Sequence, residues 1–154
     1  MTEFQASAVW GGASDGVKFE APNGLAVDAD GRVYSTDFQA GYLRRFSPSG
    51  VMEFEVGRTG TEPGRLANPI GVAIAGNGAI FVSESGSSRV SRFAPDGTFE
   101  SVFGGPGSQA GQFQSAMGIA ASDRSDVFVA DFGNHRVQVF DSNGEFQREW
   151  GQLG

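Results

Sequence analysis

The sequence has no cysteine, one histidine and one lysine among its 154 residues. The lack of cysteine excludes a disulfide framework and a thiolate metal site. A single histidine, His135, narrows the acid–base chemistry open to one chain, and we expect no cofactor. No run approaches the 18 consecutive apolar residues of a membrane-spanning helix, and Met1–Phe4 lacks the basic and apolar parts of a signal peptide. We therefore expect a soluble protein without membrane contact, cytoplasmic if Met1 is the native start.

Basic residues are also scarce. Eighteen acidic residues stand against eleven basic ones, so the formal net charge is −7. A negative chain is repelled by the phosphate backbone of nucleic acids, which makes a nucleic-acid partner unexpected. The hydrophobic fraction of 39% and the 14 phenylalanines argue against disorder despite 24 glycines.

The glycines recur in register with a repeat of 47 residues. The same step separates three copies of several other positions, among them Val33, Ile80 and Val127. A fixed period in this range is typical of blade or solenoid architectures, whose units bury their apolar faces only against one another. The repeated glycines are Gly24, Gly71 and Gly118, then Gly50, Gly97 and Gly144, then Gly57, Gly104 and Gly151.

Each copy divides into four strand-like runs separated by turn residues, the pattern of an all-β protein. The first run is short and apolar, as in Gly71–Ile74, which favours a strand buried on both faces. The second is β-branched and aromatic, the third alternates, and the fourth is the most polar and should lie outermost. Four antiparallel strands graded in this way predict a propeller blade that runs from axis to rim. The predicted blades are residues 19–57, 64–104 and 111–151, with an extra outer strand and junction in 1–18.

Three blades cannot close a ring, since known propellers need at least four. A lone chain would leave apolar blade faces in water at both ends of the stack, so we expect it to associate with itself. The alternative is that the sequence is a piece of a longer propeller. The run Phe4–Gly11 resembles the fourth run Phe146–Gly151, which gives the chain four outer strands and three inner sets. The sequence leaves open which of the two terminal outer strands a closed ring uses.

The stretch Asp131–Asp141 resembles the signature of the NHL repeat, and Gly111–Phe113 upstream fits it too. The other two copies, at Phe19–Asp28 and Gly64–Ala73, are similar. The resemblance covers nearly the whole chain and implies a β-propeller, usually of six blades. Two chains of three blades related by a two-fold axis would complete such a six-bladed ring, so we expect a homodimer. It implies little about activity, because such propellers serve as RNA binders, protein-interaction modules, sensors and enzymes.

One acidic position recurs in all three copies, at Asp37, Glu84 and Asp131. A ring of carboxylates at a channel mouth could bind a hard cation such as calcium. We favour instead a carboxylate–guanidinium pair inside each blade, with bidentate geometry for Arg89 and Arg136, which follow their acids by five residues. Asp37 faces Tyr42 at that place and is the odd member.

The innermost strands begin near the axis at Asn23, Ile70 and Met117, each followed by one of the repeated glycines. Two apolar residues and one amide offer no acid–base pair and no metal-ligand set, but they could line a small apolar pocket. We expect Gly24, Gly71 and Gly118 to serve packing where the blades converge.

These observations lead us to expect a non-catalytic scaffold or binding module whose main partner is itself, with another protein or a small ligand as further partners. Two alternatives stay open. An RNA-binding propeller would show a strongly salt-dependent RNA affinity. A metal-dependent lyase or hydrolase would lose stability on chelation.

Overall fold

The computed structural model describes residues 16–151, which form twelve strands in three sheets and a single turn of 3₁₀ helix, η1 (Phe132–Asn134). The helix is far too short to cross a membrane, and no other helix occurs in this part of the chain. The expected strand at Phe4–Gly11 lies outside the described residues. The strands are β1 Pro22–Val27, β2 Val33–Asp37, β3 Tyr42–Phe46, β4 Met52–Gly57, β5 Pro69–Ile74, β6 Ile80–Glu84, β7 Arg89–Phe93, β8 Phe99–Gly104, β9 Ala116–Ala121, β10 Val127–Asp131, β11 Arg136–Phe140 and β12 Phe146–Trp150.

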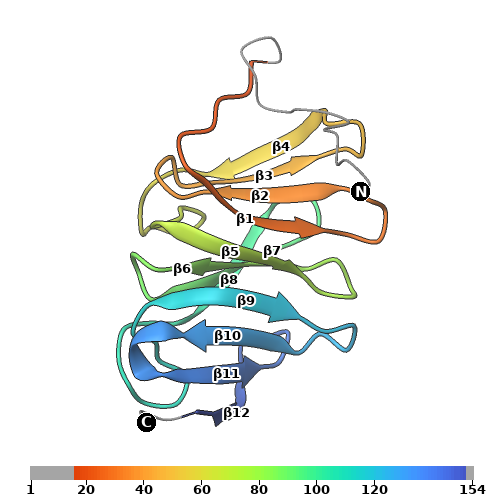
Figure 1. Ribbon diagram of the computed structural model, residues 1–154. Helices are drawn as coiled ribbons and strands as arrows, with labels where there is room; N and C mark the ends of the chain where they lie inside the picture. The colour runs from red at the N-terminus through yellow and green to blue at the C-terminus, as the bar shows by residue number, and fades with distance from the viewer. Residues whose placement is uncertain (1–15, 152–154) are drawn as a thin grey trace, which may run out of the picture.

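Each sheet is an antiparallel blade whose strands pair in chain order: β1–β4 form blade 1, β5–β8 blade 2 and β9–β12 blade 3. The three blades stack on one another, and β1, β5 and β9 lie side by side (Figure 1). The polar fourth strand lies at the far edge of every blade. The prediction of three four-stranded antiparallel blades is therefore confirmed. The C-terminal copy of the outer strand, β12, pairs with β11 in blade 3.

The turns follow from their residues. The carboxylate of Asp141 accepts hydrogen bonds from the backbone N–H groups of Asn143 and Glu145, which closes the β11–β12 turn. The glycine that ends this turn, Gly144, has φ of +86°, a conformation that L side chains rarely adopt. Gly50 and Gly97 stand in the same conformation in the other two blades. Turn chemistry of this kind sets the register of the outer strand pair.

The hydrophobic core lies between blades rather than inside them. One cluster joins blades 1 and 2, and a second joins blades 2 and 3. We call the side of a blade that packs on the next blade its forward face, and the other side its rear face. The forward face of blade 2 presents Phe81 and Val90, while its rear face presents Val72, Ile80 and Val82. Both faces of a blade thus need a neighbour to be buried.

A residue of the connecting loop seals each contact between blades. Leu66 lies in the cluster between blades 1 and 2, and Phe113 in the cluster between blades 2 and 3. Both side chains are fully buried. Phe113 packs against Phe140 of blade 3, with ring centroids 5.5 Å apart.

The expectation that the first strand is buried on both faces holds for β5 but is wrong for β1. Val72 of β5 is 5% exposed, whereas Leu25 at the same place in β1 is 72% exposed. The cause is positional, because blade 2 covers only the forward face of blade 1. The pattern of the strand is the same in both blades, and its burial depends on the neighbour.

We predict that Phe113→Ala lowers the free energy of unfolding by about 3–5 kcal/mol, because it leaves a cavity between two blades. Denaturant unfolding followed by circular dichroism measures this change. Val102→Ala is the matched control, since Val102 is 44% exposed on the outer strand and its truncation should cost less than about 1 kcal/mol. Equal losses in the two variants would contradict the placement of the core.

Candidate functional site

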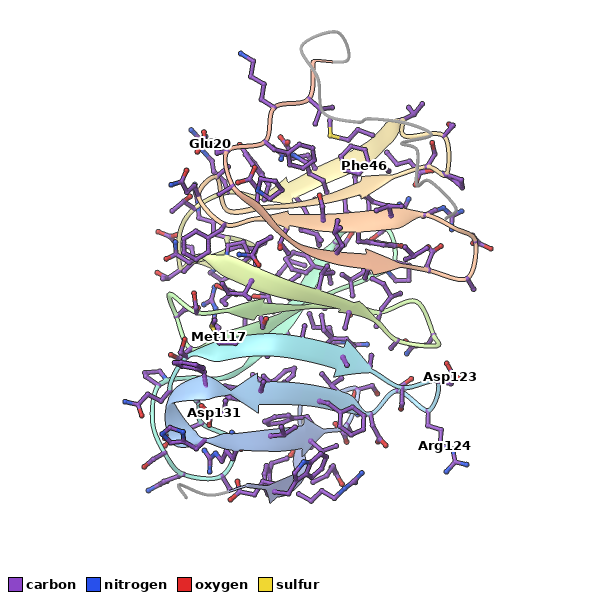
Figure 2. The ribbon with its side chains drawn as sticks, in the orientation of Figure 1. Glu20, Phe46, Met117, Asp123, Arg124 and Asp131 are labelled. Atoms are coloured by element: carbon purple, nitrogen blue, oxygen red, sulfur yellow. The ribbon has the colours of Figure 1, made fainter. Side chains whose placement is uncertain are left out.

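The two ends of the blades carry different kinds of residue. Met117 and Asp131 lie at the end that holds the loops between blades, and Asp123 and Arg124 lie at the opposite end (Figure 2). We call these the junction end and the turn end. Candidate residues such as Met117 and Asp131 thus lie at one end of the blades, and acidic residues of the tight turns, such as Asp123, lie at the other.

At the turn end the acidic groups are engaged locally. Asp28 accepts hydrogen bonds from the N–H groups of Asp30 and Arg32 and from the hydroxyl of Tyr34. Burial by itself raises the pKa of Asp28, but these hydrogen bonds outweigh it and the pKa is lowered. A pocket of about 470 Å³ opens here between the first turns of blades 1 and 2. Asp28, which lines this pocket, is therefore engaged in stabilising its own turn.

At the junction end the three recurring acids, Asp37, Glu84 and Asp131, are completely buried. Each accepts a hydrogen bond from the backbone N–H of the residue 17 positions earlier, where the connecting loop meets the first strand. The N···O distances are 2.9 Å from Glu20, 2.8 Å from Ala67 and 2.7 Å from Gln114. The carboxylate therefore ties the end of the second strand to the entry of the first.

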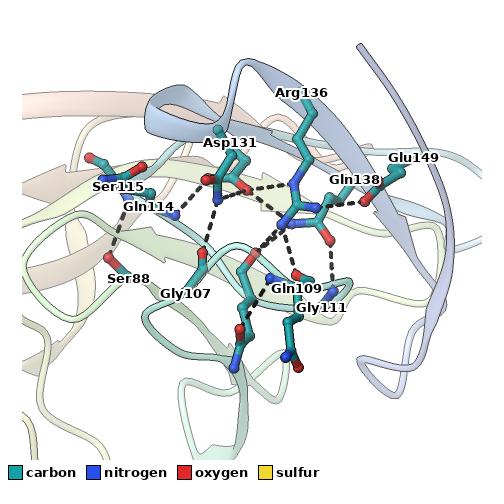
Figure 3. A network of polar contacts seen from close by, with 12 residues as sticks. Ser88, Gly107, Gln109, Gly111, Gln114, Ser115, Asp131, Arg136, Gln138 and Glu149 are labelled. Atoms are coloured by element: carbon teal, nitrogen blue, oxygen red, sulfur yellow. Dashed lines mark hydrogen bonds and ion pairs between the residues drawn. The ribbon is translucent and has the colours of Figure 1, made fainter. Parts of the chain in front are cut away.

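In blades 2 and 3 the acid pairs with arginine through one nitrogen only. Arg89 Nε lies 3.0 Å from Glu84 Oε1, and Arg136 Nε lies 2.8 Å from Asp131 Oδ2. The expected bidentate pairing is therefore wrong. Other guanidinium N–H groups donate to loop carbonyls: Arg89 to Thr61 and Arg65, and Arg136 Nη2 to Gln109 and Gln112. Arg136 Nη1 donates instead to the carboxylate of Glu149, at 2.9 Å. Figure 3 shows this network around Asp131, where Arg136 holds the connecting loop against blade 3.

In blade 1 the cationic partner of the buried acid is a residue that was not predicted from the sequence. Arg44 Nη1 lies 3.0 Å from Asp37 Oδ2, and its side chain is only 4% exposed. The place seven residues after the acid is Arg44 here, Ser91 in blade 2 and Gln138 in blade 3, and all three contact the carboxylate. Polar residues at a buried strand position in every copy were the signal. Tyr42 is the register partner of Asp37 but does not replace the arginine.

The arrangement leaves these acids little freedom to act on a ligand. Asp37 also accepts the N–H groups of Ala21 and Ala40. Burial alone raises its pKa, but the backbone N–H groups and Arg44 together hold the pKa of Asp37 below its ordinary value. Each acid serves its own blade rather than one shared ring. Among residues 16–151, no group of three or more acidic or histidine side chains is placed to hold a metal ion.

The axial positions Asn23, Ile70 and Met117 lie at the start of β1, β5 and β9. Asn23 is exposed and the other two are half-buried. Their backbone joins the blades, since the hydroxyl of Thr36 donates to the Ile70 carbonyl at 2.9 Å and that of Ser83 donates to the Met117 carbonyl.

Two of the three axial glycines are crowded. A Cβ added to Gly71 would lie 2.9 Å from Ile119 Cγ2, and one added to Gly24 would overlap the Ile70 carbonyl. A Cβ at Gly118 would meet only Ala130, at an ordinary 3.8 Å. The difference arises because no further blade covers the forward face of blade 3 within residues 16–151.

Met117 also lines an apolar pocket on the forward face of blade 3, together with Phe132, His135 and Trp150. The pocket has a volume of about 340 Å³. His135 occupies a left-handed backbone position, with φ of +56°, that is held by Gly41 and Ser88 in the other blades. The other two blades therefore have no histidine at this turn position.

Comparisons with known proteins place the fold. Residues 113–140 match the model of the NHL repeat. No curated protein matches the chain. Similar solved structures include virginiamycin B lyase from Staphylococcus aureus (18% identity, TM-score 0.67, 87% of this chain and 42% of that one). A chain of a nidogen/laminin complex has 22% identity and a TM-score of 0.70, and the match covers 88% of this chain and 50% of that one. A gluconolactonase from Xanthomonas campestris has 20% identity and a TM-score of 0.63, and the match covers 88% of this chain and 48% of that one. At these identities the likeness shows the fold alone, and the chain spans half or less of each relative.

The lowered pKa of Asp37 predicts an acid-sensitive contribution to stability. A carboxylate whose pKa is lower in the folded chain stabilises it above the unfolded pKa of about 4, and this contribution disappears as the pH falls through the folded pKa. The unfolding free energy of the wild type should therefore fall more steeply between about pH 5 and pH 2 than that of Asp37→Asn. Urea titrations across this range measure both curves, and parallel curves would refute the assignment.

The clamp on the connecting loop predicts a contrast between two arginines of one strand. Arg89→Ala leaves the buried Glu84 without its cation and should cost about 3 kcal/mol or more. Arg92→Ala removes an ion pair with the partly exposed Glu100 and should cost less than about 1 kcal/mol. Chemical unfolding of the two variants gives both values. A smaller loss for Arg89→Ala than for Arg92→Ala would contradict the role given to the buried network.

Proposed function

We propose that this NHL-type β-propeller segment is a non-catalytic binding scaffold that two copies complete, three blades from each, as a six-bladed ring. The two terminal faces of the stack support this proposal. They are the rear face of blade 1 and the forward face of blade 3, and each is the counterpart of a face that lies buried between blades. A scaffold of this kind binds its ligands only when the ring is whole.

Of the seven large exposed apolar residues among residues 16–151, five lie on these two faces. Leu25, Val27 and Met52 on the rear face of blade 1 are 72%, 64% and 39% exposed. On the forward face of blade 3, Trp150 is 50% exposed and Phe132, at the edge of the pocket, 70%. Apolar surface collected in this way marks a site of association, because its burial is favourable in water.

The faces also match in position. Val72 and Ile74 of blade 2 pack on Tyr34, Leu43 and Val56 of blade 1. One repeat later, Ile119 and Ala121 of blade 3 pack on Phe81, Val90 and Phe103 of blade 2. The next pair in this series is Leu25 and Val27 of a second copy, which would pack on Phe128, Val137 and Trp150. The rear face of blade 1 in one copy would therefore pack on the forward face of blade 3 in the other, in the same way as blades 2 and 3 pack on the preceding blade within the chain.

The junction end supplies the binding surface in this proposal. A ring of two copies would place Asn23, Ile70 and Met117 of each around its mouth, which suits a small, mainly apolar ligand held by two amides. The non-catalytic assignment is supported by the buried acids, whose oxygens already accept hydrogen bonds from their own blade. The length of the solved relatives also agrees, since two copies of this chain approach the length of one.

The proposal predicts a particle of twice the chain mass of 16.1 kDa. Size-exclusion chromatography with light scattering, run from low to high micromolar concentration, measures it directly. Circular dichroism of the same fractions controls for folding. A folded species that keeps the monomer mass at every concentration would refute the shared ring, and would instead indicate that further blades of a longer chain cover these faces.

A further inference from the structure

The pocket on the forward face of blade 3 has a filled counterpart in each of the other two blades. It lies against Gly151, the glycine that follows the last strand. At the same place in blade 1, a Cβ added to Gly57 would lie 3.0 Å from Leu66 Cδ1. In blade 2, a Cβ added to Gly104 would lie 2.5 Å from Phe113 Cε2. A side chain from the following connecting loop therefore fills this place twice, and the third place is open.

The residue that would fill the third place exists in the chain. Phe19 stands 47 residues before Leu66, which itself stands 47 before Phe113. Its ring lies 6.0 Å from that of Phe46 on the rear of blade 1, much as Phe113 lies 5.5 Å from Phe140 on the rear of blade 3. Leu66 and Phe113 are fully buried, whereas Phe19 is half-buried. Phe19 has one of its two expected neighbours, its own blade.

We infer that the pocket formed by Met117, Phe132, Val137 and Trp150 is the receptor for Phe19 of a second copy of this chain. The inference rests on the proposed ring and names the contact that holds it together. The contact is continuous with the two internal ones and uses different surfaces on the two copies, a projecting ring on one and a pocket on the other. In a ring of two copies it occurs twice, and an aromatic side chain in a desolvated pocket is the kind of anchor that dominates association energy.

One polar bond of the internal contacts has no counterpart at this one. Thr36 and Ser83 each donate a hydroxyl hydrogen bond to the first strand of the next blade. The same position in blade 3 is Ala130, which has no hydroxyl. The acceptor in the second copy would be the carbonyl of Asn23, one repeat before Ile70. Ala130→Ser should therefore add one hydrogen bond to each of the two contacts and lower the dimer dissociation constant about tenfold.

The sharpest test separates the two surfaces on different molecules. Phe19→Ala removes the projecting aromatic side chain and leaves the pocket intact. Ala130→Arg places a bulky cation in the pocket and leaves Phe19 intact. Each variant alone should raise the dimer dissociation constant by roughly a hundredfold or more, since both contacts of its homodimer are damaged. An equimolar mixture should form a heterodimer more readily than either variant forms a homodimer, because one of its two contacts is intact. Sedimentation velocity with one variant fluorescently labelled measures all three constants.

Two variants serve as matched controls. Val102→Arg adds the same charge on an outer strand away from both terminal faces, and Val51→Ala truncates an exposed residue of the β3–β4 turn. Both should keep the wild-type dissociation constant. Heterodimer formation also shows that the two damaged variants are folded.

The outcomes distinguish this inference from the proposed ring. If the wild type is a dimer and neither Phe19→Ala nor Ala130→Arg changes its dissociation constant, the inference is overturned while the proposed six-bladed ring stands. Damaged variants whose mixture associates no better than each alone would point to a contact between like surfaces, and would overturn it as well. A monomeric wild type would overturn both.

Discussion

The structure depends on one constraint: a blade has no core of its own. Each blade is a single sheet with two apolar faces, and the buried clusters lie only between neighbouring blades. A face without a neighbour stays in water, as the 72% exposure of Leu25 against 5% for Val72 shows. The apolar positions that stabilise the chain between blades are the same ones that are exposed on its two terminal faces. The strands at the two ends of the stack differ from the middle ones only in what covers them.

The buried acids show how the constraint is met where the chain passes from one blade to the next. The loop must be held at the entry of the first strand, and a buried carboxylate does this by accepting backbone N–H groups. The charge of the carboxylate then needs a partner. Blades 2 and 3 take it from Arg89 and Arg136, which also reach the loop carbonyls, while blade 1 takes it from Arg44. One structural need is met by different residues, so the acid recurs while its partners vary.

The similarity to structures of a lyase, a gluconolactonase and a nidogen/laminin complex limits what the fold says about function. These proteins share a scaffold but include both enzymes and a protein–protein complex, as expected when function depends on side chains placed on a common fold. In this chain the recurring polar residues are used to hold the blades together. In the ring that we propose, the apolar terminal faces form the contacts between copies and the axial mouth holds the ligand.

The sequence by itself determined the blades. The 47-residue period, the graded polarity of four runs and the turn glycines are local patterns, and they placed every strand of the described chain and the acidic position of each blade. They could not determine the partner of Asp37, because a guanidinium two residues further along the strand comes into reach only when the sheet is formed. They could not show that Gly151 borders an open pocket while Gly57 and Gly104 are covered, since the three positions read alike. Only the tertiary structure decided which faces are buried, because burial depends on the neighbouring blade and not on the residues of the strand itself.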